Sequence, residues 1–271
     1  MGRFLGWQLS KRTFKQPRVI PFHGRLLKCY PDSTSTSAAL YFNGLADYWE
    51  MKFIKAYLRP GDNFLDIGAN TGVYSILAAA CVGEAGSIDA FEPMERTALR
   101  IEEQAALNQL KNLEVRRSVV SDVTGLVEFG FADNDAMMHM KRGTESGAAT
   151  IESKSIRLDD FKPHKAYAMA KMDIEGAEPL ALRGATHRLE QNNPPVWLLE
   201  LAGYSDHYGM STTEVIAFLR EAGYGCAMYN DEAGTLQDTE EPWKWGAQNV
   251  LAIAFAHRQI VEQRLTSARF K

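Results

Sequence analysis

The feature that most constrains this fold is the alternation, from residue 46 onward, of short apolar strands with segments of helical period. Strands that alternate with helices in this way build a parallel sheet whose two faces are both covered by helices. We therefore expect an α/β fold with a doubly wound, mostly parallel sheet of seven strands. The expected strands are residues 63–67, 87–91, 113–120, 166–172, 195–201, 226–229 and 250–255.

The segments between the strands carry signals that begin and end helices. We expect helices over residues 47–58, 94–110 and 177–189, one that begins after Gly72 and ends before Gly83, and one between a capping box at 211–214 and Gly223. Residues 126–131 and 150–158 are expected to be extended, and residues 132–149 to form a polar loop. The last two strands are expected to pair antiparallel around a turn near Asp231.

The composition of the chain excludes a disordered, fibrous or membrane-spanning protein. With 45% hydrophobic and 24% charged residues, the 271-residue chain matches an ordinary globular protein. Its longest apolar run, residues 76–82, is far shorter than the ~20 residues that cross a bilayer. The three cysteines form no metal-binding pair, so we expect a reducing cytoplasm and no structural metal.

The charge of the chain is distributed unevenly. The first 28 residues carry seven lysines and arginines and no acidic residue, whereas the rest of the chain is acidic. We therefore divide the chain into a basic N-terminal extension, residues 1–45, and one domain over residues 46–271. Because aromatic residues are interspersed, the extension suits contact with an anionic lipid surface, a phosphate-bearing substrate or nucleic acid. A solvated, poorly ordered terminus explains the same composition.

A glycine-bearing turn joins the first strand of the expected sheet to the next helix, in the order Asp66, Ile67, Gly68, Ala69, Asn70, Thr71, Gly72. Such a turn lets a ligand approach the backbone, and free amides at the helix start attract electron-rich groups. The turn departs from the dinucleotide pattern GxGxxG, because Asn70 replaces the middle glycine and Asp66 places a negative charge where a pyrophosphate would lie. A cationic ligand fits better, and S-adenosylmethionine carries a sulfonium and an ammonium but no phosphate.

An acidic residue follows the second strand. Glu92 stands 24 residues after Gly68, at the position of an acid that accepts the ribose hydroxyls of a nucleoside. Together with the glycine turn, Glu92 predicts a nucleoside cofactor. The third strand ends near Ser118, where the adenine is expected to lie.

A third polar segment, residues 171–178, follows the fourth strand. Lys171, Asp173 and Glu175 alternate onto one face, which by itself indicates an ion-paired strand end. However, ligands of open α/β sheets bind beyond the carboxyl ends of the strands. Asp173 is therefore also a candidate for a role in catalysis.

These segments together resemble the FkbM-type S-adenosylmethionine-dependent methyltransferases. The similar segments are FLDIGANTGVYS (64–75), AFEP (90–93), the helix end that contains Asn108, SIRLDDF (155–161) and KMDIEGAE (171–178). The resemblance spans about residues 46–255 and implies a class I methyltransferase, Rossmann-like fold. It also implies O-methylation of hydroxyl groups on sugars, polyketides and other secondary metabolites. The chain departs from the family pattern at Gln104, where an asparagine is expected.

Matching the motifs residue by residue assigns roles that the resemblance implies. Asp66, Gly68, Asn70 and Gly72 would line the methionine end of S-adenosylmethionine, and Glu92 would hold its ribose. Asp173 would border the methyl group that is transferred.

Methyl transfer to an alcohol requires a group that removes the hydroxyl proton. Asp173 is the first candidate by position, and His207, in the loop after the fifth strand, is the second because imidazole titrates near neutrality. Alternatively, Asp173, Glu175 and Glu200 would gather a Mg²⁺ ion that acidifies the acceptor hydroxyl. Carboxylates at adjacent strand ends are also common without a metal, so no metal ligand is assigned.

Three other functions compete with this interpretation. An RNA methyltransferase would use the basic extension, although the acidic remainder and the absence of an NPP-aromatic motif argue against it. An NAD-linked oxidoreductase would share the fold but lacks the glycine pattern. A binding module with a vestigial pocket is disfavoured by motifs at three separate strand ends.

Overall fold

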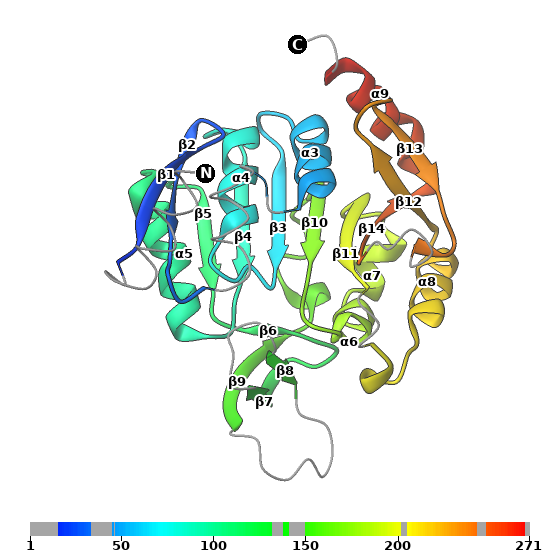
Figure 1. Ribbon diagram of the computed structural model, residues 1–271. Coiled ribbons are helices and arrows are strands. Elements are labelled where there is room, and N and C mark those ends of the chain that lie inside the picture. Colours follow the sequence, from blue (N-terminus) through cyan, green and yellow to red (C-terminus); the bar gives the residue numbers. More distant parts are fainter. Residues whose placement is uncertain are drawn as a thin grey trace.

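The computed structural model describes residues 16–33, 45, 47–131, 138–140, 150–201, 205–242 and 248–268. Its main sheet has eight strands in the order β13-β12-β14-β11-β10-β3-β4-β5 (Figure 1). The strands are β3 (Asn63–Ile67), β4 (Ser87–Phe91), β5 (Leu113–Arg116), β10 (Met169–Met172), β11 (Val196–Glu200), β12 (Tyr224–Asn230), β13 (Thr235–Asp238) and β14 (Asn249–Ala254). Strands β5, β4, β3, β10 and β11 run parallel, and β14 lies antiparallel between β11 and β12. This topology confirms the doubly wound, mostly parallel fold.

The edge of the sheet beyond β12 differs from the sequence prediction. The turn near Asp231 joins β12 to β13, an additional strand, and not to β14. The Asn230 side chain accepts a hydrogen bond from the Ala233 amide at 2.9 Å, and Gly234 supplies a positive φ of 64°, so the chain reverses tightly there. The predicted antiparallel pairing of β12 with β14 is confirmed, but it is reached through this extra hairpin.

Helices cover both faces of the main sheet. One face packs against α3 (Tyr48–Tyr57), α4 (Val73–Val82), α5 (Glu95–Leu107) and α9 (Arg258–Ala268). The other face packs against α6 (Glu178–Arg183), α7 (Thr186–Glu190) and α8 (Thr212–Glu221). The capping box predicted at the start of α8 is present, with Ser211 and Glu214 each bonding the backbone amide of the other.

The predicted helix over residues 177–189 is wrong in its continuity, because the structure divides it into α6 and α7. The division falls at Gly184, where a Cβ atom would lie 2.0 Å from the Ser121 carbonyl oxygen. Only glycine permits this backbone approach, which fixes the chain after β10 against the segment after β5.

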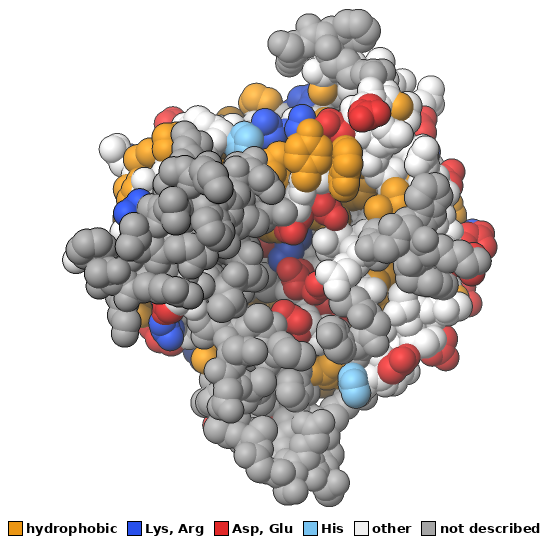
Figure 2. All heavy atoms as spheres, viewed as in Figure 1, with side chains coloured by type: hydrophobic (Ala, Val, Ile, Leu, Met, Phe, Trp, Pro, Cys, Tyr) orange, Lys and Arg blue, Asp and Glu red, His pale blue; other side chains and the backbone are white. Residues whose placement is uncertain are grey.

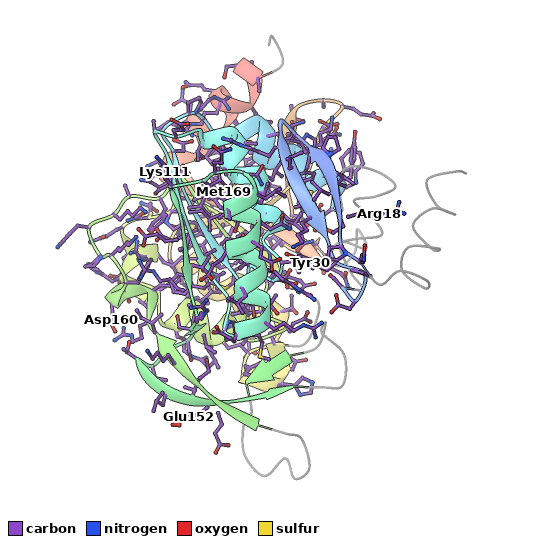
Figure 3. The ribbon with its side chains drawn as sticks, turned by 90° about the vertical axis from the view of Figure 1, so that its left-hand side faces the viewer. Arg18, Tyr30, Lys111, Glu152, Asp160 and Met169 are labelled. Carbon is purple, nitrogen blue, oxygen red and sulfur yellow. The ribbon has the colours of Figure 1, made fainter. Side chains whose placement is uncertain are left out.

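A second, four-stranded sheet projects beyond the carboxyl ends of β3 and β10, at the bottom of Figure 1. It contains β6 (Val119–Val120), β7 (Gly125–Phe131), β8 (Met138–Met140) and β9 (Thr150–Ile156). The predicted single strand over residues 113–120 is therefore wrong: β5 ends at Arg116, and Val119 packs with Ala177 and Leu180 instead of extending the main sheet. In Figure 3, Glu152 of this small sheet points away from the body of the protein. Strand β8 lies within the predicted polar loop, whose other residues, 132–137 and 141–149, lie outside the described residues.

Part of the basic N-terminal segment is built into the domain as a hairpin of β1 (Arg18–Phe22) and β2 (Arg25–Cys29). Two amide side chains of the α5 segment bond its backbone: Asn108 contacts the amide and carbonyl of Leu26 at 2.7 and 2.8 Å, and Gln104 contacts those of Lys28 at 2.9 and 2.8 Å. In Figure 3 the hairpin and Tyr30 lie beside α5. Residues 1–15 lie outside the described residues.

The described residues include no helix that is long and apolar enough to cross a membrane.

Candidate active site

The register of the parallel strands assembles the site. Ile67 lies opposite both Phe91 and Met172, and Met172 lies opposite Leu199. The residues that follow these positions, Gly68, Glu92, Asp173 and Glu200, therefore leave the sheet side by side at its carboxyl edge. Four segments that are far apart in the sequence thus contribute to one location.

The glycine turn between β3 and α4 is held by backbone contacts. The amides of Gly68 and Ala69 both donate to the Phe91 carbonyl oxygen, at 3.0 and 2.9 Å. Asn70 and Gly72 have positive φ values of 49° and 82°, and Gly72 is the N-cap of α4. The turn therefore presents the amide end of α4 to the carboxyl edge of the sheet.

Gly68 is required by packing between two backbones. A Cβ atom at Gly68 would lie 1.9 Å from the Asp173 carbonyl oxygen, and its φ of 74° already disfavours other residues. The sequence argument expected this glycine to leave room for a ligand. The structure instead shows that it lets the chain after β10 touch the turn after β3.

Glu92 is buried, with 4% of its surface exposed, and both of its carboxylate oxygens accept backbone hydrogen bonds. The Asn70 amide donates to Oε2 and the Met94 amide donates to Oε1, each at 3.0 Å. Burial raises the pKa of Glu92 to about 7, although the two amides and the nearby Lys171 oppose that shift. Each oxygen keeps a lone pair, so the carboxylate can accept two further hydrogen bonds from vicinal hydroxyls.

Asp66 is completely buried at the base of the turn. Its Oδ2 accepts a 2.5 Å hydrogen bond from the Ser75 hydroxyl, whereas Oδ1 has no hydrogen-bond partner among the described residues. Burial raises the pKa of Asp66 despite the opposing charge of Lys171. Because this oxygen is enclosed, Asp66 would favour a cationic ligand through its charge and not through a direct hydrogen bond.

The buried Lys171 and the half-buried Asp173 form an ion pair at the end of β10. The Lys171 ammonium donates to Asp173 Oδ2 at 3.0 Å and to the Gly68 carbonyl oxygen at 3.2 Å. Desolvation opposes the charge on both groups, but their mutual attraction outweighs it, so the pKa of Lys171 is raised and that of Asp173 is lowered. The Asp173 side chain is still 36% exposed, which leaves it accessible to a substrate.

Three carboxylates meet beside this pair, because Asp173, Glu175 and Glu200 place oxygens within 4.8 Å of one another. Glu200 shares a hydrogen bond with Asp173, and burial together with the Asp173 charge raises the pKa of Glu200 to about 9. Glu175 has a positive φ of 56°, and burial raises its pKa to about 7. Near neutral pH, Asp173 and Glu200 therefore share one proton.

The turn that carries Asp173 is closed by Glu178, which is buried at 1% exposure. Its Oε1 accepts hydrogen bonds from the amides of Ile174 and Gly176, at 3.0 and 3.4 Å. This acid therefore has a structural part in the motif, since it satisfies the backbone of the turn.

Two predicted site residues, Ser118 and His207, form no hydrogen bond with the carboxylates described above, among the described residues. Ser118 is half-buried in the bend between β5 and β6, where its amide donates to the Arg116 carbonyl at 3.0 Å. His207 is exposed on a short 3₁₀ helix (Ser205–Tyr208) after β11, and no hydrogen bond joins its side chain to another described residue. No described contact connects His207 to the carboxylate cluster.

Residues that sequence reasoning did not single out complete the surroundings of the site. The Tyr74 ring of α4 covers Lys171 with 5.1 Å between its centroid and Nζ, and its hydroxyl donates to Asp47 at 2.6 Å. Glu50 of α3 accepts from the Asn249 side chain at 3.3 Å, and Asn249 pairs with Glu200 across β14 and β11. The sequence offered one indication that Tyr74 lies near the site, because Tyr74 is in the first turn of the helix that follows the glycine turn.

The face that contains the site is acidic. In Figure 2, acidic side chains gather around a basic group near the middle of this face, below a patch of hydrophobic side chains. Among the described residues, the carboxylates whose charges act on one another here include Asp47, Glu50, Asp66, Glu92, Asp173, Glu175, Glu178 and Glu200, and a nearby cation that acts on several of them is Lys171. Raised pKa values remove part of this negative charge near neutral pH, and the charge that remains favours neutral or cationic ligands over anions.

Comparisons with known proteins address the same part of the chain. The family model described as the methyltransferase FkbM domain matches residues 66–226. No curated protein matches the chain at a significant level.

Similar solved structures include a putative rRNA methylase from Clostridium thermocellum, with 9% identity and a TM-score of 0.45, covering 75% of this chain and 90% of that one. A putative methyltransferase from Streptococcus mutans in complex with SAH has 9% identity and a TM-score of 0.44, covering 76% and 96%. Fibrillarin from Aeropyrum pernix with natively bound S-adenosyl-L-methionine has 13% identity and a TM-score of 0.42, covering 88% and 82%.

Proposed function

The chain belongs to the FkbM family of S-adenosylmethionine-dependent methyltransferases, and from this premise we propose that it methylates a hydroxyl group of a small molecule, a sugar or glycan, or a secondary metabolite. The proposed cofactor residues are Asp66, Gly68, Asn70, Gly72, Glu92 and Ser118, and the proposed catalytic residue is Asp173.

The residues at the carboxyl edge fit the parts of S-adenosylmethionine. The buried Asp66, with one unsatisfied oxygen, suits a ligand with cationic groups. Glu92 retains acceptor capacity for two ribose hydroxyls. The bend at Ser118 follows β5, the strand next to β4, and this position supports the proposed contact with the adenine. When bound, the cofactor supplies a methyl group on a positively charged sulfur.

The observation that carries the proposal is the exposed carboxylate of Asp173, held next to the glycine turn by Lys171. In the proposed step, the acceptor oxygen forms a bond to the methyl carbon while the carbon–sulfur bond breaks, and the hydroxyl proton passes to an oxygen of Asp173. The bond pair of the broken bond stays on sulfur, and the products are the methyl ether and S-adenosylhomocysteine.

The lowered pKa of Asp173 is compatible with this role. An alcohol becomes strongly acidic as its oxygen acquires the methyl group, so an ionised carboxylate of ordinary or low basicity accepts the proton late in the reaction. The ion pair with Lys171 keeps Asp173 ionised at neutral pH, and its hydrogen bond to the acceptor hydroxyl would orient the oxygen lone pair toward the methyl carbon.

The acidic face supports an acceptor that is neutral or cationic. A polyanion such as RNA would approach an ionised Asp173 and a partly ionised Glu175, since Glu200 is neutral near pH 7. RNA methylation remains the second candidate because of the basic N-terminal sequence, in which Arg25 and Lys28 already contact the domain.

A Mg²⁺ route is disfavoured by the state of the carboxylates. Lys171 already occupies Asp173 Oδ2, and the pKa of about 9 keeps Glu200 neutral near pH 7. A divalent cation would have to remove that proton and compete with a buried ammonium. Enzyme activity that is unchanged by EDTA is the expected result, and activity lost in EDTA and restored by Mg²⁺ would support the metal.

The proposal is tested by incubating the protein with trideuteromethyl S-adenosylmethionine and separate small-molecule and RNA fractions of a cell extract. Mass spectrometry should find the label on oxygen in a small molecule. Label confined to RNA would establish the second candidate, and label on nitrogen or carbon would refute O-methylation.

A further inference from the structure

Lys171 is a buried cation whose ammonium does not form a hydrogen bond with Asp66, the carboxylate on the neighbouring strand. Lys171 sits directly opposite Asp66 in the register of β10 and β3. Its Nζ nevertheless donates to the Gly68 carbonyl oxygen at 3.2 Å and to Asp173 Oδ2 at 3.0 Å. The side chain therefore extends past Asp66 to the carboxyl edge of the sheet.

Two of the three donors of the ammonium have hydrogen-bond partners at that position. They bond Gly68 and Asp173, while the Tyr74 ring lies 5.1 Å from Nζ. Lys171 is 5% exposed, and its ammonium faces the Gly68 carbonyl, the Asp173 carboxylate and the Tyr74 ring. Its contacts are with two parts of the protein that the proposed function places on either side of the transferred methyl group.

Those two parts are already in close contact through their backbones. The Asp173 amide donates to the Ile67 carbonyl at 3.1 Å, and the Asp173 carbonyl oxygen occupies the space where Gly68 would carry a Cβ. The side chain of Asp173 has no such backbone constraint. Among the described residues, its partners are Lys171 and Glu200.

We propose that Lys171 is a positioning residue that joins the glycine turn of the cofactor site to the Asp173 carboxylate through a single ammonium group. It holds the Gly68 carbonyl in place, and it orients the oxygen that receives the acceptor proton. The distance between the cofactor's methyl group and the proton acceptor is thereby set within the protein before either substrate binds. This inference rests on the proposed assignment of the glycine turn to the cofactor and of Asp173 to the acceptor.

The Lys171→Met variant tests the inference, because it keeps the length and apolar stem of the side chain and removes the ammonium. We expect hydrogen–deuterium exchange of the peptide spanning residues 64–76 to become about tenfold faster in the cofactor-free protein. We also expect the affinity for S-adenosylhomocysteine, measured by calorimetry, to fall at least about tenfold. Lys171→Arg, which keeps the charge and the donors, should recover part of both losses.

Lys165→Met is the matched control. Lys165 also bonds a buried carboxylate, Asp89, at 2.5 Å, but it lies away from the glycine turn. Its loss should lower the unfolding temperature without changing S-adenosylhomocysteine affinity or exchange in residues 64–76. If Lys171→Met does not give the wild-type circular dichroism spectrum, Lys171→Gln replaces it, since it also removes the ammonium group but leaves a polar side chain.

The outcomes separate this inference from the proposed function. Wild-type exchange and affinity in a folded Lys171→Met or Lys171→Gln variant would overturn the positioning role while leaving the methyltransferase assignment intact. If Lys165→Met loses as much S-adenosylhomocysteine affinity and exchange protection in residues 64–76 as Lys171→Met, the positioning role would also be overturned, because both losses would then reflect stability alone. A wild-type protein that binds no S-adenosylhomocysteine would instead refute the proposed cofactor site.

Discussion

Glu92 should make the affinity for the nucleoside part of the cofactor depend on pH. In the free protein, burial raises the pKa of Glu92 to about 7, so the carboxyl group is largely protonated at pH 6 and largely ionised at pH 8. Ribose hydroxyls donate hydrogen bonds and therefore favour the ionised form, which lowers the pKa in the complex. Binding should consequently strengthen as the pH rises through 7.

The size of the effect follows from this pKa. A group with a pKa of about 7 is about one tenth ionised at pH 6 and about nine tenths ionised at pH 8. If the bound state requires the carboxylate, the dissociation constant should be about tenfold lower at pH 8 than at pH 6, equivalent to about 1.4 kcal/mol. The Glu92→Gln variant should bind more weakly and lose this dependence.

The suitable assay is calorimetric titration with 5′-methylthioadenosine, which keeps the ribose and adenine but lacks the ionisable amino acid of the full cofactor. Glu178→Gln is the matched control, because Glu178 is equally buried, accepts two backbone hydrogen bonds and also has a pKa of about 7. Its replacement should leave the pH dependence in place. Constant affinity between pH 6 and 8 in the wild type, or an unchanged dependence in Glu92→Gln, would refute the ribose assignment.

Three further expectations concern catalysis, the glycine turn and stability. Asp173→Asn should lower turnover by about 100-fold while S-adenosylhomocysteine affinity stays within about threefold, because an amide cannot accept the proton; turnover near the wild-type rate would make His207 the leading candidate. In urea titrations, Gly68→Ala should lower the free energy of unfolding by about 2–4 kcal/mol, because its Cβ would clash with the Asp173 carbonyl oxygen. Gly61→Ala is the control, since Gly61 has a similar φ of 89° but open space around it, and should lower the free energy of unfolding by only about 1 kcal/mol. The thermal midpoint of the cofactor-free protein should fall as the pH rises from about 5 to 9. The folded state raises the pKa of Glu200 to about 9, so the stability that its protonated form contributes is lost over this range. A midpoint that rises between pH 5 and 9 would contradict this pKa shift.

Local features of the sequence were sufficient to predict the alternation of strands and helices in the main sheet. Apolar runs gave β3 and β4 with their observed bounds, 63–67 and 87–91, because buried parallel strands are continuous hydrophobic segments ended by glycine and proline. The glycine turn and Glu92 were identifiable because their chemistry lies in short stretches of chain. The capping box at Ser211 was predicted for the same reason.

The sequence could not show contacts between segments that are far apart along the chain, and such contacts occur at the ends of several elements. Gly184, between α6 and α7, packs against the Ser121 backbone, and Val119, beyond the end of β5 at Arg116, packs against α6. Neither contact is encoded in the periodicity of its own segment. The basic residues after position 17 gave no indication that they belong to a hairpin fixed by Gln104 and Asn108.

The electrostatics of the site depend on the register of the sheet. The sequence placed Lys171 beside Asp173, but only the pairing of β10 with β3 and β11 brings Asp66 and Glu200 to the same location. Burial and the spacing of charges then determine that Asp173 is ionised while Glu200 holds a proton, although both are acids at strand ends. A pKa depends on the distances to every neighbouring charge and on exclusion of water, and those quantities exist only once the chain has folded.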